Sequence, residues 1–257
     1  MLQHPETSGE QNREPLLEVR DLSRDFGGLR AIASVSFRIF SGEIVGLIGP
    51  NGAGKTTLFA LLSGFLAPTE GEITFRNIPV AGKRPDRLCH LGLARTFQIV
   101  RPFPEMTVHE NVRAAAVFGK TSRPAAMVMT REVEEILAHT GLLAKAGHLA
   151  SSLSLPERKR LEVARTLATR PRLLLLDEVL AGLNPREVEE AIPLIRSLNT
   201  ERGIAILMIE HNVKAIMGIC RRLLVINFGR LIFDGPPQEA AENPAVIQAY
   251  LGEQPGA

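Results

Sequence analysis

The residues with the most recognisable chemistry form a glycine-rich loop behind a short apolar run. Residues Ile44–Ile48 lead directly into Gly49, Pro50, Asn51, Gly52, Ala53, Gly54, Lys55, Thr56 and Thr57. Glycines can adopt backbone angles closed to residues with a Cβ, so successive N–H groups of this loop can surround one anion. Lys55 supplies a positive charge for β- and γ-phosphates, and the Thr56 hydroxyl can ligate Mg²⁺. The loop predicts a binding site for a nucleoside triphosphate.

The segments around the loop favour this interpretation over a chance glycine-rich turn. The apolar run before it is typical of a strand, and residues 57–62 predict a helix. The N-terminal end of such a helix carries partial positive charge and would face the same phosphates.

Two carboxylates follow a second apolar run, and they fit the same chemistry. Residues 173–176 are all leucine, a pattern typical of a parallel strand that is covered on both faces, and Asp177 and Glu178 come directly after it. Asp177 can hold the metal near Thr56, and Glu178 can accept a proton from the attacking water. Paired acids at a strand end are usually only solvated, but the glycine loop earlier in the chain favours the functional interpretation.

Three further residues are candidates, each with a second interpretation that stays open. Phe26 stands beside two glycines and could stack on an adenine ring, although most such phenylalanines belong to the core. Gln98 closes an apolar strand and could orient water or contact the metal, or be a surface amide. His211 follows the apolar run 204–209, at the end where parallel sheets bind ligands, and could contact a γ-phosphate, although a lone histidine is most often structural.

The element pattern predicts an α/β fold, with a mainly parallel sheet flanked by helices as in P-loop NTPases, an antiparallel β subdomain and a helical insert. Helices are expected at residues 108–117, 131–138 and 158–168, with Ser154 and Glu157 as a capping box, and residues 121–129 as a linker. Pro193 predicts a kink or an earlier break in the helix after residue 184. The predicted units are a flexible tail at 1–15, a nucleotide-binding core at 16–98 and 161–240, a helical subdomain at 99–160 and a C-terminal tail at 241–257.

Bulk composition excludes several classes of function. The net charge is +2 over 257 residues, which gives no field strong enough to indicate nucleic acid as a partner. Two cysteines in a chain of this size favour a reducing compartment. The polar first 15 residues do not resemble a secretory signal, and no apolar run approaches the roughly 20 residues that span a bilayer. We therefore expect a soluble protein unless something else holds it at a membrane.

Taken together, these motifs resemble the ATP-binding-cassette ATPases in order and spacing. The resemblance covers nearly all of residues 16–252 and is carried by residues 49–57, 96–98, 174–178, 181–184 and 210–211. Within that family, residues 26–29, 94–98, 106–112 and 249–252 look most like the ATP-binding subunits of branched-chain amino-acid uptake systems.

The resemblance implies cofactors, residue roles and partners. ATP and Mg²⁺ would bind, with Phe26 on the adenine, Glu178 as general base, His211 on the γ-phosphate and Gln98 coupling the site to a membrane partner. Ser154 would contact the nucleotide of a second cassette, either a paralogue or another copy. Integral membrane permease subunits and, indirectly, a solute-binding protein are the other implied partners, which places the protein peripherally on the cytoplasmic face of the inner membrane.

The chain departs from the family in the signature loop that would reach that second nucleotide. The usual sequence is Leu-Ser-Gly-Gly-Gln, whereas residues 153–157 read Leu-Ser-Leu-Pro-Glu. Pro156 has no N–H to donate, and Glu157 is expected to bring a negative charge toward a polyanion. In addition, Val179 and Asn184 replace the more usual proline and aspartate. We expect weak hydrolysis by the chain alone and pairing with a paralogue whose loop is intact.

Three rival functions stay open at this point. A cassette never contacts the cargo, so a lipid or lipopolysaccharide exporter is the main rival to amino-acid import. A soluble mechanical ATPase is the second rival, and a nucleotide-dependent binding module without turnover is the third. The single cassette, short insert and near-neutral charge count against the mechanical class.

Overall fold

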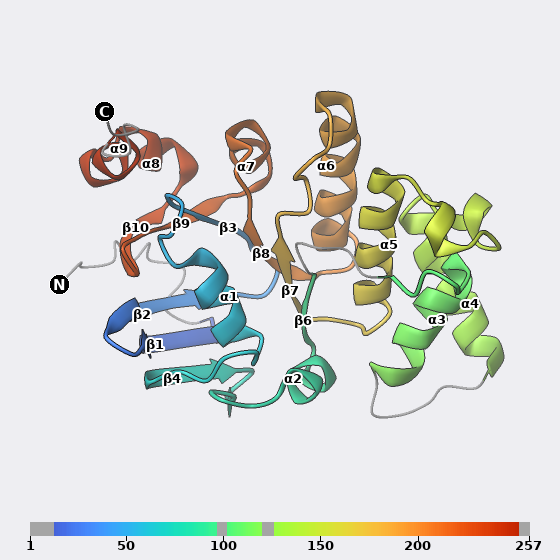
Figure 1. Cartoon of the computed structure of the whole chain (residues 1–257), viewed down its shortest axis with the longest axis horizontal. Helices are drawn as coiled ribbons and strands as arrows, with labels where there is room; N and C mark the ends of the chain where they lie inside the picture. The colour runs from blue at the N-terminus through green and yellow to red at the C-terminus, as the bar shows by residue number, and fades with distance from the viewer. Residues whose placement is uncertain (1–12, 97–101, 120–125, 252–257) are drawn as a thin grey trace.

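The molecule is built on two β-sheets (Figure 1). The computed structural model describes residues 13–96, 102–119 and 126–251. Within these residues, a six-stranded sheet has the order β10-β9-β3-β8-β7-β6, and every neighbouring pair is parallel except β9 and β10. Its strands are β3 (Ile44–Ile48), β6 (Leu93–Arg95), β7 (Leu173–Asp177), β8 (Ala205–Ile209), β9 (Arg222–Asn227) and β10 (Arg230–Gly235).

The inner strands of this sheet are buried on both faces, as their unbroken apolar sequences predict. Successive side chains of a strand point to opposite faces. In β7, Leu174 and Leu176 accordingly pack into one hydrophobic core, while Leu173 and Leu175 pack into another. The sheet thus separates two cores.

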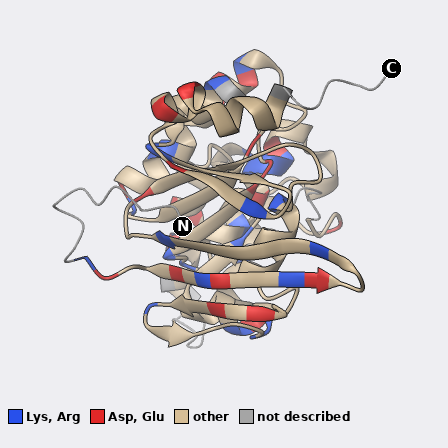
Figure 2. Ribbon diagram, turned by 90° about the vertical axis from the view of Figure 1, so that its left-hand side faces the viewer, with Lys and Arg blue, Asp and Glu red and all other residues tan. Residues whose placement is uncertain are grey.

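The second sheet covers one face of the first. Its order, among the described residues, is β2-β1-β4-β5, and all pairs are antiparallel. Its strands are β1 (Leu17–Phe26), β2 (Leu29–Ile39), β4 (Glu70–Phe75) and β5 (Ile78–Pro79). Helix α1 (Lys55–Leu62) lies between the two sheets, because Leu58, Phe59 and Leu61 share one core with both. Acidic and basic side chains alternate along β1, at Glu18, Arg20, Asp21, Arg24 and Asp25 (Figure 2).

Helices cover the other face and extend to one side of the sheet (Figure 1). Three of them, α3 (Val108–Phe118), α4 (Ala126–His139) and α5 (Leu155–Leu167), pack on one another, and 3-10 turns at Leu143–Lys145 and Ala150–Ser152 join α4 to α5. The remaining helices are α2 (Pro85–Leu91), α6 (Pro185–Thr200), α7 (Val213–Ile219), α8 (Pro237–Glu242) and α9 (Pro244–Leu251). The predicted fold class, with its antiparallel subdomain and helical insert, is confirmed.

Several predicted boundaries were wrong. Helix α5 begins at Leu155 instead of residue 158, and the predicted capping box of Ser154 and Glu157 is confirmed. Pro156 is tolerated there because a proline in the first turn sacrifices no intrahelical hydrogen bond. Helix α4 begins at Ala126, inside the predicted linker. Helix α6 continues through Pro193, which excludes the earlier break but not the kink among the two outcomes predicted for it. The last described residues, 241–251, complete α8 and form α9.

Helix α2 was not predicted, although its signals are present. Pro85 and Asp86 stand in its first turn, and Gly92 ends it in the left-handed region with φ 99°. Helix length is also informative: no helix in the described part of the chain is both long and apolar enough to cross a bilayer.

Candidate nucleotide site

The glycine loop joins β3 to α1, and two neighbouring segments fix its shape. β3 is a central strand between β8 and β9, so the loop lies at the carboxyl edge of the sheet. A Cβ on Gly49 would stand 2.0 Å from the Ile226 carbonyl oxygen, and one on Gly54 would stand 2.8 Å from that of Ala31. Both glycines have positive φ, 154° and 107°. The close backbone approach therefore requires glycine at both positions.

Lys55 closes the loop upon itself. Its side chain is buried, and Nζ donates to the carbonyl oxygens of Gly49 at 2.6 Å and Pro50 at 2.7 Å. The ammonium group is thereby held inside the ring of loop residues. This is the position from which a lysine can exchange carbonyl partners for phosphate oxygens.

Asp177 lies across a cavity from the start of α1. The cavity has a volume of 790 Å³, and Thr56, Arg95 and Asp177 are among its lining residues. Asp177 is 3 % exposed, and its Oδ2 accepts a hydrogen bond from Arg95 Nη2 at 2.6 Å. Its backbone N–H donates to the Thr96 hydroxyl at 3.0 Å. The structure thus brings together the predicted metal candidates Thr56 and Asp177.

Glu178 and His211 form a pair at the ends of neighbouring strands. His211 Nε2 lies 3.0 Å from Glu178 Oε1. The backbone of Glu178 has φ 51°, a left-handed conformation that costs a residue with a side chain about 1 kcal/mol and is concentrated at functional sites. The Glu178 N–H donates to the Ile209 carbonyl oxygen at 3.0 Å, which fixes this turn. Such a pair can orient a carboxylate that accepts a proton.

A buried charged group beneath this pair was missed at the sequence level. Lys159 of α5 donates to the Glu178 carbonyl oxygen at 3.1 Å, and Glu210 accepts the Leu180 N–H at 2.7 Å. Burial raises the pKa of Glu210 to about 7, and burial also lowers the pKa of Lys159. The position of Glu210 beside His211 was a signal, whereas nothing in the sequence indicated Lys159. Lys159 thus connects helix α5 to the backbone of the catalytic candidate Glu178.

The signature loop differs from expectation in its charge. Ser154 is the exposed N-cap residue of α5, and its N–H donates to Glu157 Oε2 at 2.9 Å. Lys145 Nζ lies 2.5 Å from Glu157 Oε1, and this partner holds the pKa of Glu157 at about 2. The negative charge is therefore paired within the chain and folded back on the helix start. Lys145 thus partly compensates the negative charge that Glu157 was expected to bring toward a phosphate.

Phe26 and Gln98 complete the predicted set. Phe26 is 43 % exposed at the end of β1, with the Arg24 guanidinium 4.7 Å from its ring centroid, so its ring is not a core side chain. The adjoining strand β2 contacts the glycine loop where Ala31 faces Gly54. Gln98 lies outside the residues that the structure describes. Ser154 is not among the residues that line the cavity of Thr56 and Asp177.

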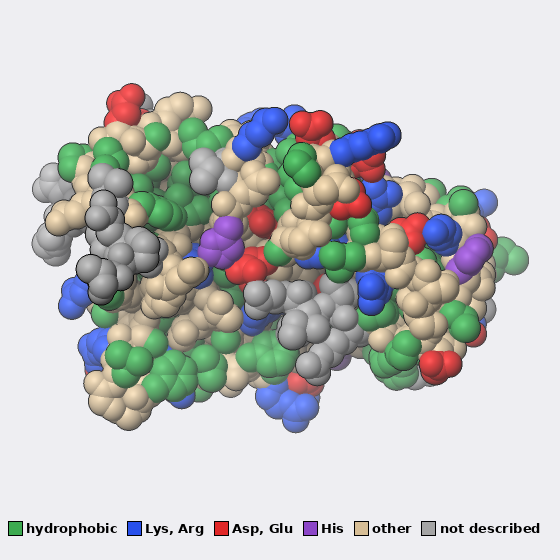
Figure 3. Space-filling view, turned by 45° about the horizontal axis from the view of Figure 1, so that its top comes forward, with side chains coloured by type: hydrophobic (Ala, Val, Ile, Leu, Met, Phe, Trp, Pro, Cys, Tyr) green, Lys and Arg blue, Asp and Glu red, His purple; other side chains and the backbone are tan. Residues whose placement is uncertain are grey.

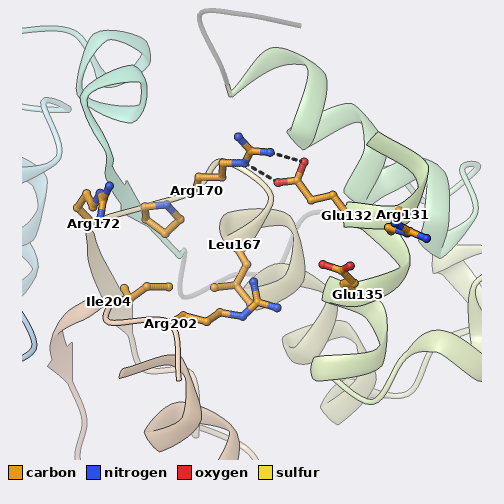
Figure 4. A pocket seen from close by; sticks show the side chains of 9 residues that line it. Arg131, Glu132, Glu135, Leu167, Arg170, Arg172, Arg202 and Ile204 are labelled. Atoms are coloured by element: carbon orange, nitrogen blue, oxygen red, sulfur yellow. Dashed lines mark hydrogen bonds and ion pairs between the residues drawn. The ribbon is translucent and has the colours of Figure 1, made fainter. Parts of the chain in front are cut away.

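A second cavity, of 460 Å³, lies at the opposite edge of the sheet (Figure 4). Arg172 and Ile204 line it, and they directly precede β7 and β8. Arg170 is joined to Glu132 by contacts of 2.7 and 3.0 Å, while Arg131 and Arg172 lie at opposite ends of the lining. The arginines that line this cavity do not converge on one point. The cavity lies at the amino ends of the strands, whereas the glycine loop lies at their carboxyl ends.

Comparisons with known proteins identify similar chains over nearly the whole length. The family model described as "ABC transporter" matches residues 32–181, and that described as "Branched-chain amino acid ATP-binding cassette transporter" matches residues 230–255. The chain is 43 % identical to the high-affinity branched-chain amino acid transport ATP-binding protein LivG of Salmonella typhimurium, covering 93 % of this chain and 99 % of that protein. It is 41 % identical to BraF of Pseudomonas aeruginosa, with 93 % and 98 % coverage.

Two further similarities bear on the fold and on the rival functions. The lipopolysaccharide export system ATP-binding protein LptB of Acidithiobacillus ferridurans is 37 % identical, with coverage of 93 % and 98 %. The crystal structure of a nucleotide-free ATP-binding cassette from an ABC transporter superposes with a TM-score of 0.84 at 30 % identity, covering 93 % of this chain and all of that one.

The paired charge at the start of α5 generates a testable pH dependence. A Glu157→Gln variant keeps an acceptor for the Ser154 N–H but loses the Lys145 ion pair, which should lower the free energy of unfolding at pH 7 by about 0.5–1 kcal/mol. Because the pKa of Glu157 falls from its ordinary 4.5 to about 2 in the fold, the difference should be complete above pH 4.5 and vanish as pH falls toward 2. Urea unfolding across this range measures it.

Glu187→Gln is the matched control. Glu187 occupies the same capping position in α6, where it accepts the Asn184 N–H at 2.8 Å, and the described ion pairs give it no cationic partner. The role of Lys145 would be contradicted if Glu157→Gln lowered the free energy of unfolding equally at every pH, or if both variants lowered it by the same amount.

Proposed function

The chain belongs to the ABC transporter family of ATP-binding proteins, and on that premise we propose that it is the ATP-hydrolysing subunit of an importer for branched-chain or other hydrophobic amino acids. The observation that carries the substrate class is its similarity to LivG and BraF along almost the full length of each chain. The similarity of its last strand and helices to a branched-chain family model supports the same assignment.

The nucleotide is proposed to bind at the loop of residues 49–57. Lys55 would exchange the Gly49 and Pro50 carbonyls for phosphate oxygens, and the N-terminus of α1 would add its partial positive charge. Phe26, exposed on the strand hairpin that adjoins this loop, is proposed to stack on the adenine.

The residues present fit a magnesium ion beside the nucleotide. Thr56 and Asp177 offer a hydroxyl and a carboxylate to one cavity, and oxygen ligands are those that Mg²⁺ prefers. No cluster of three or more His, Cys, Asp or Glu is found in the described residues, so phosphate oxygens and water would complete the ligand set. Gln98 is the third proposed ligand. When bound, the ion neutralises charge on the phosphates during transfer.

Glu178 is proposed as the general base. Its carboxylate is held by His211 at 3.0 Å, and its strained backbone directs it from the end of β7. It would take a proton from the water that attacks the γ-phosphate, while His211 fixes the orientation of the carboxylate and contacts the phosphate.

A Glu178→Gln variant should bind ATP with unchanged affinity but lose nearly all hydrolysis, since an amide keeps the shape and lacks basicity. Bound ATP would then keep two cassettes associated, which size-exclusion chromatography with and without Mg-ATP detects. Glu189→Gln, at an exposed carboxylate paired with Lys214, is the control and should behave as the parent does. Full activity of the Glu178 variant would remove this residue from the role.

The second cassette is proposed to be a paralogue. Ser154 and the Leu155 N–H can still reach a partner's phosphate, but Pro156 has no N–H, and each missing charge-assisted hydrogen bond costs about 1.5–3 kcal/mol. Leu155 also packs against the segment at Gly182, where a Cβ would lie 3.4 Å from its Cδ2. The loop is therefore poorer in donors and less adaptable than its usual form.

Restoring the glycines separates the lost donors from the altered charge. Leu155→Gly with Pro156→Gly should raise ATP turnover of the chain alone by about tenfold, the equivalent of one recovered hydrogen bond. Glu157→Gln alone should change turnover little, because its charge is already paired with Lys145. Brisk turnover by the parent, unchanged in the double variant, would contradict the paralogue proposal.

The permease is proposed to dock between the α/β core and the helical subdomain of residues 99–160. Phe65, Cys89 and Ala115 line the cavity there, and Phe103 is 48 % exposed with the Arg165 guanidinium 5.0 Å from its ring centroid. Met106 is half-buried. Phe97, Ile99 and Val100, which we propose to belong to the same docking surface, lie outside the described residues. The cavity is the same one that Thr56 and Asp177 line at its other part, and an exposed aromatic beside its apolar residues suits a short helix of the partner.

A Phe103→Asp variant should reduce uptake of labelled leucine by vesicles that hold the permease and binding protein by tenfold or more, while ATPase activity of the isolated chain stays at the parent level. Phe118→Asp, at a side chain that is 74 % exposed on α3, is the control. Joint loss of ATPase and folding would show that Phe103 is a core residue instead.

The location and the rival function follow from the partners. Binding to the permease would hold the chain peripherally at the cytoplasmic face of the inner membrane, where ATP is available, with the solute-binding protein acting only indirectly. Lipopolysaccharide export remains the alternative because of the LptB similarity. Basic and acidic side chains are mixed on the face in Figure 3, which suits neither nucleic acid nor a mechanical ATPase acting on it.

A further inference from the structure

Arg95 is buried beside the proposed metal ligand, although the proposed reaction gives it no task. It is the last residue of the edge strand β6, and its side chain is 10 % exposed. Nη2 donates to Asp177 Oδ2 at 2.6 Å, and Nη1 donates to the Ser63 hydroxyl at 3.1 Å. The ring centroids of Phe59 and Phe65 lie 5.8 and 5.9 Å from the guanidinium carbon. Two aromatic rings, a hydroxyl and a carboxylate thus hold one cation in place.

The position of this cation conflicts with that of a metal ion. Arg95 and the proposed ligands Thr56 and Asp177 line the same cavity. A divalent cation and a guanidinium on one carboxylate repel each other, and the repulsion is strong where little water screens it. Without either cation, the nearly buried Asp177 would present an unpaired negative charge to the nucleotide phosphates.

The backbone of Asp177 is fixed independently of this ion pair. Its N–H donates to the Thr96 hydroxyl, and β7 pairs with β8 up to the register of Asp177 and Ile209. A change of partner at the carboxylate therefore requires movement of side chains only. The cavity gives the guanidinium space on one side in which to move.

We propose that Arg95 is a positioning residue that acts as a stand-in counter-ion for Asp177: it pairs and orients the carboxylate while the metal is absent, and it releases that carboxylate to Mg²⁺ when the nucleotide arrives. The inference rests on the proposed role of Asp177 as a metal ligand. Arg95 thereby limits the repulsion between Asp177 and metal-free nucleotide, and it makes the metal compete for its ligand.

The test compares nucleotide binding with and without the metal. The dissociation constant of a fluorescent ATP analogue is measured in excess Mg²⁺ and in EDTA. The readout is the ratio of the constant in EDTA to the constant in Mg²⁺. In Arg95→Met, affinity in EDTA should fall about tenfold while affinity in Mg²⁺ is kept or improved, so the ratio should grow about tenfold. Arg95→Lys retains the charge and should keep the ratio near that of the parent.

A matched control removes an ion pair elsewhere. Arg222 donates to Asp234 at 2.5 and 2.7 Å at the beginning of β9, away from the carboxyl edge of the sheet. Arg222→Met should change stability without changing the ratio. If Arg95→Met does not fold, Ser63→Ala provides the test, since it removes one anchor of Arg95, retains the charge and should raise the ratio by a smaller factor.

The outcomes separate this proposal from the one on which it rests. The role of Arg95 is overturned if Asp177→Asn alters the metal dependence but a folded Arg95→Met leaves the ratio unchanged. If Arg95→Met does not fold, an unchanged ratio in Ser63→Ala overturns it in the same way. An Asp177→Asn variant with the metal dependence of the parent overturns the assignment of Asp177 and the Arg95 proposal with it. A purely structural Arg95 would weaken binding equally in Mg²⁺ and EDTA.

Discussion

The structure depends on the close backbone packing of three segments around the glycine loop. Gly49 leaves no room for a Cβ beside Ile226, and Gly54 leaves none beside Ala31. The turn after β9 connects the glycine loop to β2. The Gly229 N–H donates to the Ala53 carbonyl oxygen, and the Gly229 carbonyl oxygen accepts a hydrogen bond from the Ala33 N–H. The backbone packing of the two sheets thus shapes the loop. Such preorganisation lets the binding energy of the nucleotide go into affinity instead of ordering the loop.

The two cores explain how the remaining groups reach this loop. Alternate residues of β7 and β8 anchor the sheet to the antiparallel subdomain on one face and to the helices on the other. The carboxyl ends of these strands therefore carry Asp177, Glu178 and His211 to one edge. Lys159 links the helical part to the same edge through the Glu178 carbonyl. A shift of α5 would act on the proposed base through a direct contact.

Residue types and spacing were sufficient to predict the glycine loop, the paired acids and the antiparallel subdomain, because each has a local signal. The Arg95–Asp177 ion pair joins residues 82 positions apart on neighbouring strands, so no local pattern could predict it. The pairing of Lys145 with Glu157 depends in the same way on how two turns of the helical part pack. The capping box of Ser154 and Glu157 is a local signal and correctly predicted where α5 is capped, although the helix itself was expected only from residue 158. Pro156 lies in the first turn, where its fixed φ is favourable.

The altered signature loop stabilises the start of its own helix, while it offers fewer backbone N–H donors than the usual sequence. Pro156 at the first turn, Glu157 on the Ser154 N–H and Lys145 on Glu157 each stabilise the beginning of α5. Glycines at the same positions would expose backbone donors and leave the helix start less stable. Stability and function therefore favour different residues here, a conflict common at binding sites. Residues 154–157 stabilise the start of α5 at the expense of backbone N–H donors. A second cassette with an intact signature loop would have to provide such donors in their place.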